Sequence, residues 1–153
     1  MSESPPIQCS TLSAAERPLL NKFYKSQSSP MRASDNGVAW VARSGEIIAA
    51  LNLSPVPGGH WLTGLLVAGQ WRRQQVARRL IEQARQQAEG CIWLFCHPDL
   101  QAFYERLDFT VSEDMPAMLC ERLARYRRSK PLLAMLLPQS SAAGSRPGNS
   151  TSV

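Results

Sequence analysis

At 153 residues, with 44% hydrophobic and 19% charged residues, the chain has the size and composition of one soluble globular domain, which excludes a disordered protein. No stretch approaches the roughly 18 apolar residues of a membrane span, and the N-terminus lacks the apolar run of a secretory signal, so we expect a cytoplasmic protein. The net charge of +5 comes largely from arginine and suits a polyanion, a phosphate-bearing ligand or solubility alone.

The N-terminal part of the chain predicts one helix and three strands. Ser13 and Glu16 have the spacing of a capping box, and the apolar residues after them predict a helix that begins there or nearer to Pro18. Three strand-like runs follow, at residues 38–43, 46–55 and 60–67. The short, glycine-containing connections between these runs predict antiparallel hairpins.

The middle of the chain predicts a helix and then a buried strand. After Gln75, apolar residues recur on one side of a helix that Gly90 is well placed to end. Residues 91–96, CIWLFC, are apolar on both parities, which is typical of a strand covered on both faces. Because a helix separates this strand from the one that ends at Val67, we expect the two strands to be parallel.

The C-terminal part predicts two helices and two short strands. His97-Pro98-Asp99 can open a helix, and the apolar spacing after it places Tyr104 on the inward face. A strand at 109–111, a helix at 115–126 and a strand at 131–137 follow.

The fold class predicted from these elements is α+β. The sheet is mixed, with antiparallel N-terminal strands and a central parallel pair, and helices flank it. We expect one domain over residues 1–138 and a disordered tail over residues 139–153, because the polar tail cannot offset the entropy of ordering it.

One candidate site lies where the strand ending at Val67 is followed by a helix. The stretch VAGQWRRQQVARRL, residues 67–80, holds four arginines. The start of a helix exposes unpaired N–H groups whose partial charge favours an anion, and the guanidinium groups of Arg72 and Arg73 can bind phosphate oxygens. The stretch therefore suits a pyrophosphate; alternatively, the arginines only solvate the start of the helix.

The same stretch resembles the acetyl-CoA signature of the GNAT family of N-acetyltransferases, roughly Arg/Gln-x-x-Gly-x-Gly/Ala after a strand that ends in valine. Here Arg72-Arg73-Gln74-Gln75-Val76-Ala77 follows Val67 at the matching distance. A second family motif, a helical tyrosine followed by Gly-Phe, is matched by Tyr104 and Asp108-Phe109. The order of predicted elements agrees with the family from about residue 7 to 137.

Two positions depart from the family pattern, because Gln75 and Asp108 stand where the family has glycine. Glycine tolerates close approach and positive φ, so a side chain at position 75 crowds the pyrophosphate or forces different backbone angles. Aspartate adopts the left-handed region more readily than most residues, and we expect the change at position 108 to be milder.

The resemblance implies a set of site residues for acetyl-CoA and for a primary amine. The backbone of Leu65, Leu66 and Val67 would pair with the pantetheine arm, and Tyr104 would lie near the sulfur as proton donor. The N–H group of Val67 would stabilise the developing oxyanion. The pyrophosphate would be held by Arg72, Arg73, Gln74, Gln75, Val76 and Ala77.

The proton acceptor for the attacking amine is less well defined by the sequence. His60, at the start of the strand that ends at Val67, titrates in a suitable range and can pass a proton through water, although a lone histidine on a strand is also a common structural residue. We expect His97 to cap a helix or contact the cofactor. Trp61 is a candidate for lining the acceptor site, or otherwise for the core.

Three functions are consistent with these residues. The first is acetyl transfer from acetyl-CoA to a primary amine by direct attack in a ternary complex. The second is a degenerate relative that binds a CoA ester or a protein without turnover, motivated by Gln75 and by the lack of an obvious carboxylate base. The third, nucleic-acid binding through two arginine clusters, has no recognised motif behind it. The amine acceptor and the oligomeric state are not defined by the sequence.

Overall fold

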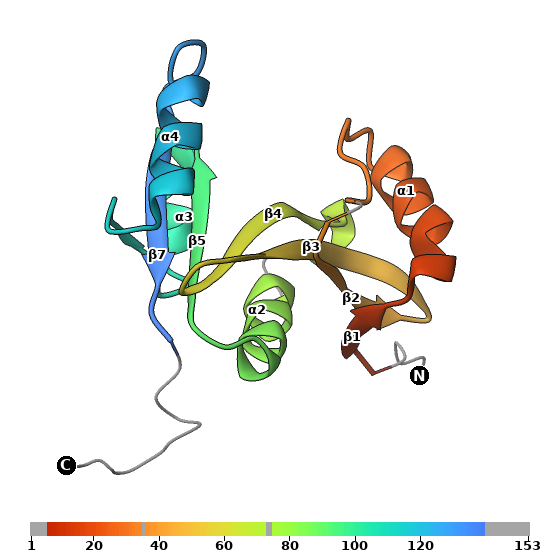
Figure 1. Cartoon of the computed structure of the whole chain (residues 1–153). Coiled ribbons are helices and arrows are strands. Elements are labelled where there is room, and N and C mark those ends of the chain that lie inside the picture. Colours follow the sequence, from red (N-terminus) through yellow and green to blue (C-terminus); the bar gives the residue numbers. More distant parts are fainter. Residues whose placement is uncertain (1–5, 35, 73–74, 140–153) are drawn as a thin grey trace, which may run out of the picture. The chain divides into compact units, whose positions relative to one another are not determined.

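The computed structural model describes residues 6–34, 36–72 and 75–139 (Figure 1). Its strands have the hydrogen-bonded order β1-β2-β3-β4-β5-β7-β6. The predicted α+β class with a mixed sheet is therefore confirmed. The chain divides into two compact units, the first with residues up to 54 and 62–87, the second with residues 55–61 and from 88 onward. Of the predicted tail, residues 140–153 lie outside the described part.

The first unit contains the N-terminal elements and the segment that carries the arginines. In chain order these are β1 (Gln8–Leu12), the short 3-10 helix η1 (Ala14–Glu16), α1 (Arg17–Ser26), β2 (Val38–Ser44), most of β3 (Glu46–Val56), the later part of β4 (Gly59–Val67), η2 (Gly69–Trp71) and α2 (Val76–Gln87). The pairing of β2 with β3 is antiparallel, as predicted.

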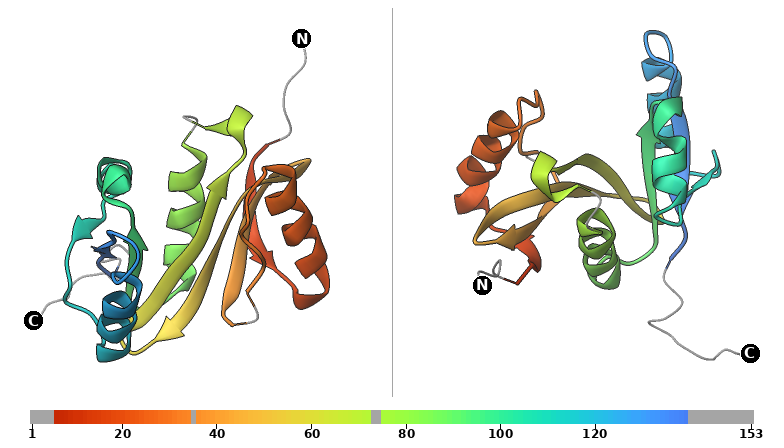
Figure 2. Two further views of the ribbon diagram at one scale, coloured as in Figure 1. Left: turned by 90° about the horizontal axis from the view of Figure 1, so that it is seen from above. Right: turned by 180° about the vertical axis from the view of Figure 1, so that it is seen from behind.

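The core of the first unit forms on both faces of its strands, because α1 and α2 lie on opposite sides of them (Figures 1 and 2). Under α1, Leu20, Phe23 and Tyr24 pack against Val41 and Ala50, which are register partners in β2 and β3. The apolar stripe of α2 is also buried, as its spacing predicts; it consists of Val76, Ala77, Leu80, Ile81 and Ala84.

The N-terminus of the first helix shows how the proline is accommodated. The Ser13 N–H donates to Glu16 Oε1 at 3.2 Å, so the capping box is confirmed. It caps the 3-10 turn η1, and α1 then begins at Arg17 with Pro18 in its first turn, where no intrahelical N–H is required. Strand β1 was not predicted: its polar, largely exposed residues have no alternating pattern, and it forms by pairing with β2.

The second unit contains the remaining elements. They are the start of β4, β5 (Cys91–Cys96), η3 (Pro98–Leu100), α3 (Gln101–Glu105), β6 (Thr110–Val111), α4 (Ala117–Tyr126) and β7 (Leu133–Leu137). Residues Gly59–Trp61 of β4 pair in parallel with Cys91–Trp93 of β5, which confirms the predicted parallel pair. Strand β7 pairs antiparallel with both β5 and β6.

The two faces of β5 are covered by different helices, α3 on one side and α4 on the other (Figures 1 and 2). Side chains of consecutive strand residues point to opposite faces. The ring of Phe95 contacts that of Tyr126 on α4 edge-on. Cys96 therefore points toward α3, where it lies close enough to Tyr104 to affect the pKa of its hydroxyl. Side chains also alternate along β4, which pairs in parallel register with β5. Trp61 therefore lies on the face of the sheet that α4 covers, and His60 lies on the face that α3 covers. Among the described residues, no helix has the length and apolar character needed to cross a membrane.

Candidate acyl-CoA site

The segment that follows β4, residues 68–72, is anchored to other parts of the first unit. The N–H of Ala68 donates to the Ile48 carbonyl at 2.8 Å, and the N–H of Gly69 donates to the Gln27 side chain at 3.2 Å. Arg72 Nε donates to the carbonyl of Val67 at 3.1 Å, while the side chain remains exposed. Arg72 is therefore held at the end of β4 with its remaining N–H groups available to solvent or a ligand. Arg73 and Gln74 lie outside the described residues.

Gln75 begins helix α2 in an unusual backbone conformation. Its φ of 65° lies in the left-handed region, and its carbonyl accepts the Arg79 N–H at 3.0 Å, which makes it the residue before the first helical turn. The side chain of Gln75 is exposed, whereas Val76 and Ala77 are buried. The first-turn N–H groups of an α-helix have no partner within the helix, so this turn presents backbone donors beside Arg72.

Strand β4 departs from extended geometry at Gly64. Its φ is 68°, and the hydroxyl of Tyr24 donates to its carbonyl at 2.7 Å. A Cβ atom at position 64 would lie 2.8 Å from that hydroxyl, so glycine is required both for its backbone angle and for the close approach. Tyr24 is 1% exposed, and burial raises its pKa to about 12. The irregularity immediately precedes Leu65, Leu66 and Val67, whose side chains are half-buried.

Tyr104 lies on α3 with its ring held between two other rings. The centroid distances are 5.0 Å to Phe103 and 5.7 Å to Phe109, both in edge-on geometry. Tyr104 is 9% exposed; burial, and to a smaller extent the nearby Cys96, raises the pKa of its hydroxyl well above the usual value. Among the described residues, none hydrogen-bonds to this hydroxyl, which is protonated in neutral solution and available as a donor.

The two histidines have different surroundings. His97 Nδ1 accepts the Asp99 N–H at 3.1 Å at the start of η3, so the predicted capping role is confirmed. His60 Nδ1 is buried, and no described residue hydrogen-bonds to it. A buried polar atom without a protein partner is one that water or a ligand commonly satisfies. His60 and Tyr104 share one face of the second unit, and Trp61 lies on the other.

The family model for the acetyltransferase (GNAT) domain matches residues 35–111, half of the chain. The chain belongs to the GNAT acetyltransferase family. The matched segment contains both sequence motifs, the one at residues 72–77 and the one at residues 104–109. No curated protein sequence matches the chain.

Solved structures support the GNAT fold at low sequence identity. A GNAT-family acetyltransferase from Staphylococcus aureus Mu50 matches with a TM-score of 0.63 at 13% identity, over 88% of this chain and 100% of that one. The ribosomal-protein-S18-alanine N-acetyltransferase of Escherichia coli matches with a TM-score of 0.60 at 17% identity, over 88% and 95%. N-acetylglutamate synthase from Neisseria gonorrhoeae, complexed with coenzyme A and N-acetyl-glutamate, matches with 0.64 at 11% identity, over 91% of this chain and 36% of that one.

Both positions at which this GNAT chain lacks the motif glycine keep a left-handed backbone. The φ is 65° at Gln75 and 75° at Asp108. The side chains at both positions are exposed, so neither displaces the surrounding backbone. From the sequence, a side chain at position 75 was expected either to crowd the pyrophosphate or to force different backbone angles. The second expectation is wrong, because the residue adopts the left-handed region that glycine favours.

Two contacts next to the candidate site residues carry little signal in the sequence. Gly64 inside an apolar strand is a signal for a local irregularity, but its partner Tyr24, 40 residues earlier, carried no signal beyond helical spacing. Arg122 lies over the ring of Trp61 with its Cζ atom 4.5 Å from the centroid. In the sequence, Arg122 is one residue of a basic run that also holds Arg125, Arg127, Arg128 and Lys130.

Proposed function

We propose that this protein transfers an acetyl group from acetyl-CoA to a primary amine by direct attack in a ternary complex. The observation that carries the proposal is the left-handed backbone of Gln75 at the start of α2. This conformation is uncommon for glutamine, and it preserves the turn geometry for which the GNAT motif uses glycine.

The first unit would bind acetyl-CoA through its backbone and its arginines. The N–H groups of the first turn of α2 and the side chains of Arg72 and Arg73 would hold the diphosphate, together with Gln74, Gln75, Val76 and Ala77. The backbone of Leu65, Leu66 and Val67 would pair with the pantetheine arm, and Tyr24 fixes the strand directly before it. The donors present fit a polyanion: the described Arg72 side chain is exposed, and the helix start adds positive partial charge.

Bound acetyl-CoA would supply an activated thioester, whose C–S bond breaks as the amine nitrogen forms the new C–N bond. The Val67 N–H would donate to the carbonyl oxygen as negative charge develops there. Tyr104 would donate to the departing sulfur. Because the pKa of Tyr104 is raised, full proton transfer to a thiolate with a pKa of roughly 8.5 is uphill, so its hydroxyl would act mainly as a hydrogen-bond donor.

The amine must be neutral to attack, and an alkyl ammonium with a pKa of about 10 must first lose a proton. We propose His60 as the acceptor of that proton, through water. In support, its Nδ1 lacks a hydrogen-bond partner among the described residues.

The test is thiol release from acetyl-CoA with a panel of primary amines, using the wild type and His60→Gln. The proposal expects amine-dependent thiol release by the wild type and a much lower kcat in His60→Gln, with activity recovered only as the pH approaches the pKa of the amine, about 10. Tight binding of CoA without turnover for any amine would instead favour a degenerate CoA-binding module. A His60→Gln variant with the wild-type profile would remove His60 from the mechanism.

A further inference from the structure

We propose that Arg122 binds a carboxylate of the amine acceptor, so that the preferred acceptors are acidic amines. The inference rests on the proposed function and names its substrate class. It concerns one surface of the second unit. The rings of Trp61, Phe95 and Tyr126 form a row there, which we call the aromatic row, and Arg122 lies over its Trp61 ring.

The aromatic row consists of three rings from three elements. The ring centroids of Trp61 and Phe95 are 5.5 Å apart, and those of Phe95 and Tyr126 are 6.2 Å apart. None of the three side chains is fully buried, and Tyr126 is 40% exposed. Partly exposed aromatic rings that contact one another offer an apolar surface beside solvent, where a small ligand can pack.

Arg122 lies over this row with its charge unpaired. Its Cζ atom is 4.5 Å from the Trp61 centroid, and among the described residues no ion pair joins it to a carboxylate. The contact with the Trp61 ring uses none of the guanidinium N–H donors in a hydrogen bond, and no described residue accepts from the edge that carries them. That edge is the one that binds a carboxylate with two parallel hydrogen bonds.

The chemistry of the surface favours an anion. Trp61 Nε1 is buried and has no hydrogen-bond partner among the described residues. The indole N–H, like the guanidinium of Arg122, is a donor only, so both groups need an acceptor. Arg125 and Arg128, on or just after the same helix, add positive charge. A polyamine would meet this charge unfavourably, whereas an acidic amine would be attracted to it.

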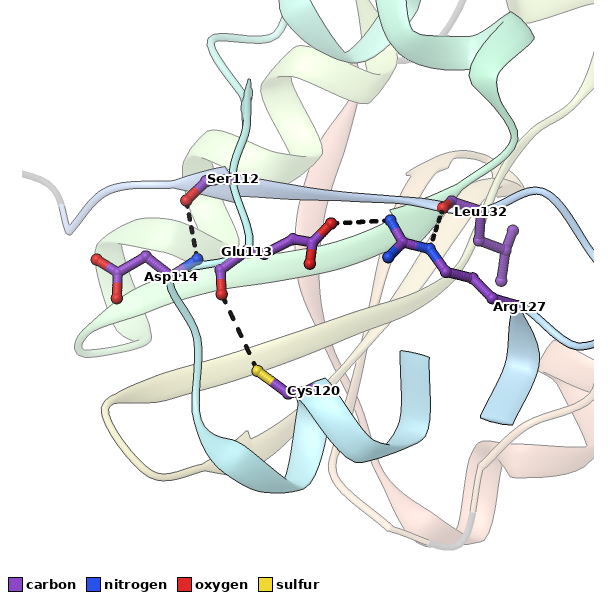
Figure 3. Close-up of polar contacts among 6 residues, drawn as sticks. All are labelled: Ser112, Glu113, Asp114, Cys120, Arg127 and Leu132. Atoms are coloured by element: carbon purple, nitrogen blue, oxygen red, sulfur yellow. Dashed lines mark hydrogen bonds and ion pairs between the residues drawn. The ribbon is translucent and has the colours of Figure 1, made fainter. Parts of the chain in front are cut away.

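Polar contacts link both ends of helix α4 to neighbouring segments (Figure 3). Arg127 donates to Glu113 at 2.9 Å and to the carbonyl of Leu132 at 2.9 Å, which ties the C-terminal end of α4 to the segments on either side of it. Near the N-terminal end, the Cys120 thiol lies 3.7 Å from the Met115 carbonyl. Glu113 therefore pairs with Arg127. Arg122 contacts Trp61 from a helix whose two ends are both linked to neighbouring segments.

The position of the aromatic row also determines whether a bound acceptor can contact His60. Trp61 and His60 are consecutive in β4 and point to opposite faces. An acceptor on the aromatic row would not touch His60 directly, which is consistent with a proton passing through water.

The experiment compares primary amines in matched pairs in which the only carboxylate of one member is replaced by a carboxamide in the other, such as 4-aminobutanoate and 4-aminobutanamide. We expect a wild-type kcat/KM at least about tenfold higher for the acid of a preferred pair, a difference of about 1.4 kcal/mol. In Arg122→Gln, we expect kcat/KM for the acid to fall and kcat/KM for the amide to stay unchanged, so that the preference is lost. Lys25→Gln, a neutralisation at an exposed site on α1 of the first unit, should keep the wild-type preference.

A second variant distinguishes the loss of carboxylate binding from a folding defect. Arg122→Lys keeps the charge but loses the planar fork, so we expect it to retain part of the preference with an unchanged thermal midpoint. Equal wild-type rates for acid and amide in every pair, or a full preference in Arg122→Gln, would overturn the inference and leave the proposed function standing. If no amine supports thiol release although CoA binds, the proposed function fails, and this inference falls with it.

Discussion

Tyr24 and Tyr104 occupy similar environments in the two units, but their hydroxyl groups differ. Both rings are buried, and burial raises the pKa of both hydroxyls. The Tyr24 hydroxyl donates to the Gly64 carbonyl at 2.7 Å, whereas the Tyr104 hydroxyl has no partner among the described residues. The difference suits two roles: the Tyr24 hydroxyl is bonded to strand β4, whereas in the proposed mechanism the Tyr104 hydroxyl would donate to bound acetyl-CoA.

The sharpest test of this comparison is Tyr104→Phe, because it should alter activity and leave stability nearly unchanged. We expect kcat to fall by about 10²-fold, the lower end of what the loss of one hydrogen-bond donor to developing charge costs. The thermal midpoint should change little, because the ring contacts with Phe103 and Phe109 remain. Thiol release and thermal unfolding, measured on the same preparation, check both parts. Wild-type turnover would remove the hydroxyl from the mechanism.

The matched substitution Tyr24→Phe should show the opposite pattern. It leaves the half-buried Gly64 carbonyl without this donor, and we expect a loss of roughly 1–2 kcal/mol in the free energy of unfolding. Affinity for CoA should fall along with it, because β4 is less well held directly before Leu65. Denaturant unfolding and a CoA titration measure the two effects. A Tyr24→Phe variant as stable as the wild type would contradict the structural role.

The pH dependence of the free energy of unfolding at high pH is a third test of the role of Tyr24. Its pKa is about 12 in the folded protein and about 10 for an unperturbed tyrosine, so the stability that it contributes is complete below pH 10 and is lost as the pH rises through about 12. We expect the free energy of unfolding to fall over this interval, with a slope of up to about 1.4 kcal/mol per pH unit from this residue. The slope should be shallower in Tyr24→Phe. Equal slopes in the two proteins would show that Tyr24 ionises alike in the folded and unfolded chain.

The smallest effects concern the two left-handed residues, one in each unit. Gln75→Gly should raise the free energy of unfolding by about 1 kcal/mol, because it relieves a positive φ that glutamine adopts unfavourably. Asp108→Gly should change it by less than about 0.5 kcal/mol, because aspartate tolerates this region. Denaturant midpoints at a constant m-value measure both. CoA affinity in Gln75→Gly should stay within about threefold of the wild type; a large rise would indicate a degenerate site.

The sequence predicted the elements whose pattern is local and repetitive. The apolar stripe of α2, the buried strand 91–96 and the capping box at Ser13 all follow from spacing, and all are present. Strand β1 was missed because its polar residues depend on pairing with β2 rather than on their own pattern. The helix predicted at 115–126 begins only at Ala117, since Pro116 caps it.

The candidate site was predictable only where a motif lies in one continuous segment. Residues 72–77 and Tyr104 could be found in this way. The contact of Tyr24 with Gly64 joins residues 40 positions apart, and the contact of Arg122 with Trp61 joins two elements that are distant in the chain. Such contacts depend on how helices cover the sheet, and no local pattern encodes them.

The central claim is that the start of α2 and its arginines bind the diphosphate of coenzyme A. Calorimetric titration of the folded wild type with CoA, and with pantetheine as the matched ligand that lacks the diphosphate, tests it most directly. The account predicts that CoA binds at least about tenfold more tightly than pantetheine and that Arg72→Ala narrows this difference. Equal affinities for the two ligands, or no heat with CoA or acetyl-CoA at millimolar concentration, would contradict it.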